Sequence, residues 1–399
     1  LIGFKVLSKK ERSDISHDGH QEEHMQPKNA QKPVFVNKHP WISAFAAIAV
    51  LVIAALPFSS MRLGLPDGGA EPKDSSPNRA YVLISDKFGE GFNGQISTVV
   101  TMPTAVAKDD QTKLQTQIAT DLFSLDNVVA VVPAAVSADN KTFLFQVVPA
   151  VKPSSVETEK LVYDIRDLNA KYKSSMDASV GVTGLTAANI DISQKISSVL
   201  PLYLGVVLAL SLLLLILVFR SILVPLLAAG GFLLTVFATM GTVVAVYQWG
   251  WLADIFGVPN PGPILSFLPI FLIGILFGLA MDYQLFLVSG MREAFTHGKS
   301  ASDSINYGIH LSRAVVIAAA LIMITVFGGF AFSHLTMIRP VGFGLAIGVI
   351  FDAFVVRLVL VPAAMTIFGK AAWWIPKWLD RILPDVDVEG AKLEREHLH

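Results

Sequence analysis

Three ionisable side chains interrupt apolar segments that are long enough to cross a membrane. Asp282 lies within 264–290, and both Asp352 and Arg357 lie within 341–368. A charged side chain at the centre of a bilayer costs at least about 2.5–3.5 kcal/mol, so such residues normally face a bundle interior and mark ion paths or charge pairs. These residue types at these positions therefore predict either proton handling or intramembrane ion pairs.

Asp282 is the first candidate for proton transfer. Its distance from Arg292 along a helix, about 15 Å at the helical rise, places it near the middle of the membrane. Desolvation at that depth disfavours the charged carboxylate, which suits a group that takes up and releases a proton near neutral pH. The adjacent Tyr283 has a hydroxyl that can donate a hydrogen bond to a carboxylate on a partner helix. The alternative is that a permanent ion pair, with Arg357 as the partner, neutralises Asp282.

The two charged residues of the last apolar segment are not expected to pair with each other. Their spacing on an α-helix turns the side chains of Asp352 and Arg357 about 140° apart. For Arg357 the sequence favours a role in charge-pair architecture over a role in transport. For Asp352 the two roles stay equally open.

Other motifs argue mainly against further chemistry. Gly342-Phe343-Gly344 with Gly348 resembles a dinucleotide-binding turn, but it opens a membrane segment and follows no soluble strand, which favours small-residue helix packing. The chain has no cysteine and no phosphate-binding GxxxxGK[ST] motif, and His297, His310 and His334 sit singly at span ends. We therefore expect no metal and no cofactor, and the net charge of -1 argues against a nucleic-acid partner.

These residues must be positioned by a membrane bundle. The chain has 399 residues, of which 53% are hydrophobic and only 16% charged, and a soluble domain would carry about 25% charged residues. A spanning helix needs about 20 apolar residues. Six segments qualify: 41–58, 199–219, 222–247, 264–290, 314–333 and 341–368.

Positive charge defines the orientation of these spans, because lysine and arginine concentrate in cytoplasmic flanks. The short loops at the other ends of the spans, 248–263 and 334–340, hold no lysine and a single arginine, Arg339. Both termini are therefore expected in the cytoplasm and the large region after the first span outside. The predicted parts are a disordered cytoplasmic linker at 1–39, a first span at 40–58, an outer domain at 59–198, a five-helix bundle at 199–368 and a cytoplasmic tail at 369–399.

The outer domain begins with a Gly-, Pro- and Ser-rich stretch, 59–78, that is typical of a linker. Periodicity then predicts strand, helix, strand, strand, helix, strand, which is the ferredoxin-like α+β order. The predicted elements are 94–102, 107–124, 127–136, 141–149, 154–173 and 178–183.

Two further segments connect or anchor the bundle. After Gly184 the sequence passes from polar to apolar without a break, which predicts a helix that enters the second span; a flexible connector is the alternative. Trp373, Trp374 and Trp378 alternate with basic residues after the last span, a pattern typical of an anchor at the membrane surface.

Several segments together resemble the MMPL branch of the RND transporter superfamily. The clearest is FGLAMDYQLFLVSGMREAF at 277–295, which resembles the Asp-Tyr span of that family. Similar segments lie at 184–204, 218–229, 348–363 and 373–384, so the likeness extends over nearly everything from about 40 to 385. The resemblance implies a plasma-membrane exporter of lipids or other hydrophobic compounds that is driven by proton influx, with Asp282 and Tyr283 as its proton-relay pair.

The chain departs from the family pattern in extent. A complete member resembles two repeats of one span, a porter domain and five spans, whereas this chain has one such repeat and resembles the C-terminal half. The expected partners are therefore a lipid or hydrophobic substrate, membrane lipids and the missing N-terminal half, with a second copy of the chain as a further option. Two other functions stay open: a non-transporting scaffold or lipid-sensing protein, and, with weaker support, an intramembrane transferase.

Overall fold

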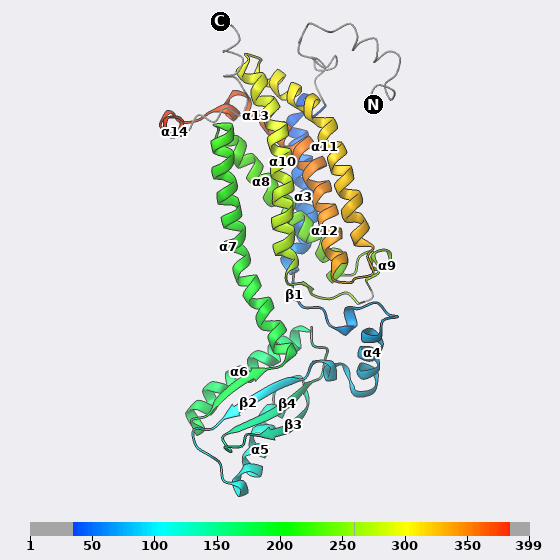
Figure 1. The fold of residues 1–399 in the computed structure, drawn as a ribbon, viewed down its shortest axis with the longest axis vertical. Coiled ribbons are helices and arrows are strands. Elements are labelled where there is room, and N and C mark those ends of the chain that lie inside the picture. The colour runs from blue at the N-terminus through cyan, green and yellow to red at the C-terminus, as the bar shows by residue number, and fades with distance from the viewer. Residues whose placement is uncertain (1–34, 259, 384–399) are drawn as a thin grey trace, which may run out of the picture.

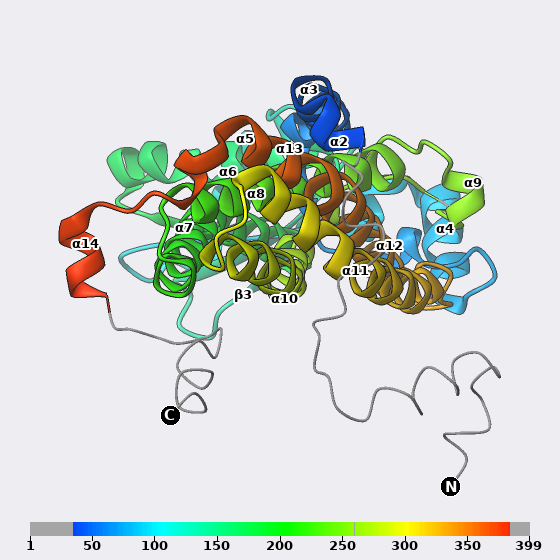
Figure 2. The same ribbon diagram turned by 90° about the horizontal axis from the view of Figure 1, so that it is seen from above.

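The structure, a computed structural model, describes residues 35–258 and 260–383. Most of the predicted 1–39 linker and the last part of the predicted 369–399 tail lie outside these residues. Figure 1 shows a bundle of long helices with an α/β domain beyond one end of it. The described chain begins and ends at the other end of the bundle, where Figure 2 shows the short helices α2 (Phe35–Lys38) and α14 (Lys377–Ile382).

Within the described residues, six helices are long and apolar enough to cross a membrane, as the sequence predicts. The π-helical stretch η6 interrupts the last span, the π-helical stretch η5 ends the α8 span, and the first and last spans end in 3₁₀ turns, η2 and η7. The spans are α3 (Pro40–Ala55) with η2 (Leu56–Ser60), α7 (Leu185–Phe219), α8 (Leu223–Val243) with η5 (Val244–Gln248), α10 (Leu268–Thr296), α11 (Ala301–Ala331), and α12 (Ile338–Ile350) continued by η6 (Phe351–Leu360), α13 (Val361–Phe368) and η7 (Gly369–Trp373).

Two spans form the interior of the bundle. The most apolar windows of the α8 span and of the last span are each 61% buried, against 17% for α7 and for α11. Close contact at glycine makes this packing possible: a β-carbon at Gly241 of α8 would lie 2.1 Å from the carbonyl oxygen of Ala54 on α3. Gly344 and Gly348 of α12 likewise pack directly on Leu272 and Leu276 of α10. The small-residue packing predicted for this stretch is therefore confirmed.

Helix α7 is continuous from the α/β domain into the membrane span, as predicted. It begins after Gly184, whose positive φ of 103° closes the preceding strand, and it continues through Pro201 without a break. It ends at Arg220, which is in the left-handed conformation. Figure 1 shows this helix leaving the α/β domain and running along one side of the bundle.

The α/β domain has the predicted order of strands and helices. Its four-stranded sheet is antiparallel in the order β3-β4-β2-β5, with β2 and β4 paired from Ile96↔Val147 to Thr101↔Thr142. Helix α6 begins after Ser155, whose hydroxyl accepts a hydrogen bond from the Thr158 amide. The elements are β2 (Ile96–Thr101), α5 (Lys108–Phe123), β3 (Val128–Val136), β4 (Thr142–Pro149), α6 (Val156–Met176) and β5 (Ser179–Thr183).

The predicted linker at 59–78 has more structure than its composition indicates. Leu63–Gly64 forms the short strand β1, which pairs in parallel with β6 (Ile264–Leu265) from the start of the fourth predicted span. Helix α4 (Ser76–Phe88) follows, and the Ser75 hydroxyl caps it by accepting from the Asn78 amide. The remaining short elements are the 3₁₀ turns η3 (Gly68–Ala70) and η4 (Glu90–Gly94) and the helix α9 (Ala253–Phe256).

Candidate functional site

Asp352 and Arg357 form a buried ion pair, so the prediction that they would not pair is wrong. The Nε of Arg357 donates to both carboxylate oxygens of Asp352, at 3.2 and 3.3 Å. The side chains are 0% and 5% exposed. The prediction assumed α-helical geometry, but η6 is a π-helix, in which residues five apart are joined by the backbone and lie on one face.

The pair leaves part of the guanidinium unused. Among the described residues, neither terminal nitrogen of Arg357 has a hydrogen-bond partner, although both are buried. An arginine has five N–H donors, and only the one on Nε is engaged here. Arg357 can therefore bind a further acceptor without giving up Asp352.

Asp282 lies on the outside of the bundle, whereas this pair is buried within it. It is exposed and belongs to a stripe along α10 that includes Phe271, Ile275, Gly278 and Phe286. The spacing of these positions places them on one side of an α-helix, and the other members are apolar or glycine. Within the described residues, no ion pair or hydrogen bond joins Asp282 to another residue. The alternative of a permanent ion pair with Arg357 is therefore not what the structure has.

Tyr283, the other residue of the predicted relay, follows Asp282 in α10. The next residue, Gln284, was not singled out from the sequence. Gln284 is completely buried, and neither polar atom of its amide has a partner among the described residues. A buried amide without partners is costly, but a neutral side chain in an apolar span is only a weak signal in the sequence, and its burial is known only from the structure. The hydroxyls of Thr235 and Thr239 on α8 are buried and unpartnered in the same way.

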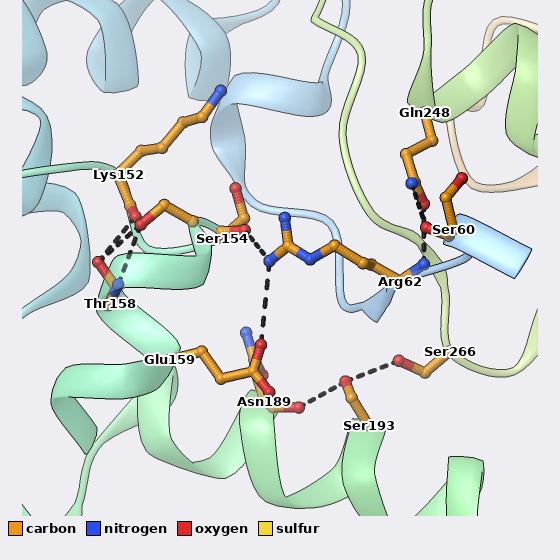
Figure 3. Close-up of polar contacts among 11 residues, drawn as sticks. Ser60, Arg62, Lys152, Ser154, Thr158, Glu159, Asn189, Ser193, Gln248 and Ser266 are labelled. Carbon is orange, nitrogen blue, oxygen red and sulfur yellow. Dashed lines mark hydrogen bonds and ion pairs between the residues drawn. The ribbon is translucent and has the colours of Figure 1, made fainter. Parts of the chain in front are cut away.

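A second candidate site is a polar cavity of about 470 Å³ where the α/β domain meets the bundle. Figure 3 shows the polar contacts of Arg62, which lines this cavity two residues after the first span. The Arg62 backbone amide donates to Gln248 Oε1 at 2.9 Å, which joins the chain just after the first span to the end of the α8 span. Its guanidinium donates to the carbonyl of Ser154 at 3.1 Å and lies 3.9 Å from the Glu159 carboxylate. Arg62 thus links the bundle to the start of α6.

The remaining wall of this junction cavity comes from the first turns of α7. Ser193 and Ser266 share a buried hydrogen bond of 2.8 Å, which joins α7 to the segment before α10. Burial and, next, the Glu159 carboxylate raise the pKa of the Tyr163 hydroxyl, so it stays protonated and able to donate at neutral pH. The cavity can hold a ligand rich in hydrogen-bonding groups.

Comparison with known proteins places this arrangement in a family. The model of the MMPL family matches residues 71–383. The chain is 44% identical over 362 residues to the membrane protein YdfJ of Bacillus subtilis, covering 91% of this chain and 49% of that protein. It is 34% identical over 359 residues to the mycolic acid-containing lipids exporter MmpL11 of Mycolicibacterium smegmatis, covering 89% of this chain and 37% of that protein.

A third relative is the probable trehalose monomycolate exporter MmpL3 of Mycobacterium leprae, which is 27% identical over 359 residues, covering 86% of this chain and 36% of that protein. The chain thus spans between about a third and a half of the length of these relatives. The matched region contains the α/β domain, the last five spans, Asp282 and the Asp352–Arg357 pair, and it contains the junction cavity except for the lining residues within 61–67, Arg62 among them. This chain is a multi-pass membrane protein that belongs to the MMPL family.

Proposed function

We propose that this protein exports lipids or other hydrophobic compounds across the plasma membrane, driven by the proton motive force. The observation that carries the proposal is the exposed carboxylate of Asp282 within the α10 span. A carboxylate without a partner at membrane depth is costly and is retained where it moves ions or protons. The exporters named among the relatives support the substrate class.

The chain acts in this proposal as one repeat of a two-repeat transporter, with the other half as its partner. Two observations support this reading. The relatives are two to three times as long as the matched region. The stripe on α10 is apolar around Asp282, and at Gly278 a β-carbon would meet nothing within 4 Å. A helix of the other half, or of a second copy, would cover this stripe and place a donor against the Asp282 carboxylate, with Tyr283 completing the relay.

We also propose that the α/β domain is a ferredoxin-like porter domain outside the cell, with both termini in the cytoplasm. The strand order β3-β4-β2-β5 with two helices between strands supports the fold. The clustering of lysine and arginine at the opposite end of the bundle supports the orientation. Helix α7 and the contacts of Arg62 then connect the porter domain to the membrane bundle, so that movement of the bundle moves the porter domain and the reverse.

Asp352 and Arg357 act in this proposal as a support of the proton path. Both terminal nitrogens of Arg357 lack a partner among the described residues, and the stretch that contains Arg357, η6, packs against α10. The pair is also needed for packing, because each charge is buried and neutralises the other. The contribution of the pair to coupling can therefore be separated from its contribution to stability only by comparing a variant that lacks one charge with a variant that lacks both.

The test of the proposed function is Asp282→Asn, with export of labelled lipid measured in cells that depend on the full transporter. We expect export to be lost while the amount of folded protein in the membrane is unchanged, because the side chain is exposed and nearly isosteric. The matched control is Asp254→Asn on α9, an acidic residue outside the spans. Export that survives Asp282→Asn would remove the proton-relay role and favour the scaffold or lipid-sensing function.

A further inference from the structure

A second cavity, of about 320 Å³, lies beside the junction cavity, between the α4 segment and the loops that close the bundle. Figure 1 shows α4 next to this end of the bundle, near α9. Two hydrogen bonds cross from one side to the other: Asn260 Nδ2 donates to the carbonyl of Gly69 at 2.6 Å, and the Thr336 hydroxyl to Glu71 Oε2 at 3.4 Å. These contacts hold the two walls together around the cavity.

The α4 wall of this cavity is acidic and aromatic. Asp67, Asp86 and Glu90 line it together with the ring of Tyr81. Burial first, and then the charge and hydrogen bond of Asp67, raise the pKa of Tyr81, so its hydroxyl stays neutral. The negative charge of this wall therefore comes from carboxylates beside an aromatic ring, which is the combination that attracts an ammonium group.

The opposite wall is apolar. It is lined mainly by prolines and aliphatic side chains from the two loops, namely Pro261, Pro263, Ile264, Met337 and Pro340. Met337 is 51% exposed and Val82, on the α4 side, is 42% exposed, so the apolar lining continues to the protein surface. Trp249, Trp251 and Leu252 are exposed at the same end of the bundle, a composition typical of the membrane–water interface. An apolar chain can therefore extend from the cavity toward the lipid.

The two basic residues of the lining do not neutralise the negative charge of the α4 wall. Arg339 donates to the carbonyls of Ser333 and Gly257 and keeps its positive charge, but the two positive charges of the lining are outnumbered by the three carboxylates of the α4 wall. Lys152 lines the same cavity as a single positive charge. The hydroxyl of Tyr247, also in the lining, is buried and has no partner among the described residues, so it can donate to an oxygen of a bound molecule.

We propose that this cavity binds the ammonium head of an amphiphile, with the carboxylates of the α4 wall around the head and the proline-rich wall against its apolar part. The shared chemistry is the ammonium group; a purely cationic amphiphile and a zwitterionic one, such as a phosphocholine, both carry it. The site does not include Asp282, Asp352 or Arg357, so the proposal stands or falls independently of proton-driven export.

The test uses four amphiphiles with the same twelve-carbon chain and different heads: dodecyltrimethylammonium, dodecylphosphocholine, dodecyl sulfate and dodecyl maltoside. Each is titrated below its micelle concentration into the purified full chain held in an amphipathic polymer, and binding is measured by calorimetry. We expect saturable binding of the two ammonium compounds and none of the sulfate or the maltoside. A stronger response to the phosphocholine than to the trimethylammonium compound would identify a zwitterionic ligand through Tyr247 and Lys152, and the reverse order a cationic one.

The variant Asp86→Asn with Glu90→Gln should lower the affinity for both ammonium compounds about tenfold, because two exposed carboxylates each contribute modestly. The matched control is Asp109→Asn with Asp110→Asn, which removes the same charge from the first turn of α5, outside the cavity. Both variants change exposed residues, so both should fold. Equal binding of all four heads, or equal affinity in the cavity variant and the control, would overturn the proposal.

Discussion

The Nε of Arg357 donates to the Asp352 carboxylate one π-helical turn away, within a π-helical stretch that is otherwise apolar. This contact exists because η6 is π-helical: the same two residues on an α-helix would point about 140° apart. Single-turn π-helical insertions are rare and recur at functional sites, and this stretch extends over Phe351–Leu360. The backbone register and the ion pair therefore support each other, and a change in either one affects the other.

Removal of one charge of this pair should be far more damaging than removal of both. Arg357→Met leaves the Asp352 carboxylate buried without a partner and should lower the free energy of unfolding by about 3–5 kcal/mol. Asp352→Asn combined with Arg357→Met removes both charges and should recover most of that loss. Thermal unfolding in detergent measures both. A double variant as unstable as the single one would mean that the pair contributes through more than charge neutralisation.

Replacement of Gln284 separates folding from function. Gln284→Met keeps the volume of the side chain and removes two buried polar atoms that have no partner, so thermal stability should be unchanged or higher. If the amide belongs to the proton path next to Asp282, export should fall even though the protein is more stable. Export and melting temperature measured on the same preparation distinguish these effects. Unchanged export would restrict the proposed path to Asp282 and Tyr283.

The architecture was predictable because its main signal is local. Long apolar runs mark all six spans, and the change from polar to apolar sequence after Gly184 marks the entry of α7. Alternation of residues such as Ile96, Thr98 and Val100, all buried on one face, marks the strands. The boundaries were less predictable: Ile264 is apolar but belongs to β6, because its partner Leu63 is distant in sequence.

The parts that escaped prediction follow a composition typical of linkers, or depend on contacts or on unusual backbone geometry. Helix α4 was missed because the proline- and glycine-rich stretch before it indicates a linker to residue 78, although its apolar residues have the spacing of an amphipathic helix. The Asp352–Arg357 pair needs a π-helical register, which residue types alone do not indicate. Asp282 was identifiable because a single acidic residue in an apolar run is conspicuous, whereas Gln284 is neutral and its burial is known only from the packing.

The close contact between α3 and α8 gives a prediction with a control in the same helix. Gly241→Ala would place a β-carbon against the backbone of Ala54 and Ala55, so the helices must separate, which should destabilise the bundle by about 1–3 kcal/mol. Gly230→Ala in the same helix meets nothing within 4 Å and should stabilise the helix by about 0.5–1 kcal/mol. Melting temperatures in detergent should therefore move in opposite directions. Equal shifts would mean that α3 and α8 do not pack closely at Gly241.

The stripe on α10 predicts where the rest of a two-repeat transporter lies. The chain has no cysteine, so Phe286→Cys, on the stripe at 62% exposure, gives a single site for a photo-reactive benzophenone. In membranes that contain the full transporter, illumination should attach this probe to a protein segment, which mass spectrometry of the linked peptides would identify. Leu321→Cys on α11 is the control: it is 53% exposed on another span and should label lipid instead. Lipid labelling at both positions would show that the Asp282 stripe faces the bilayer, and the relay would then have no partner helix on that side.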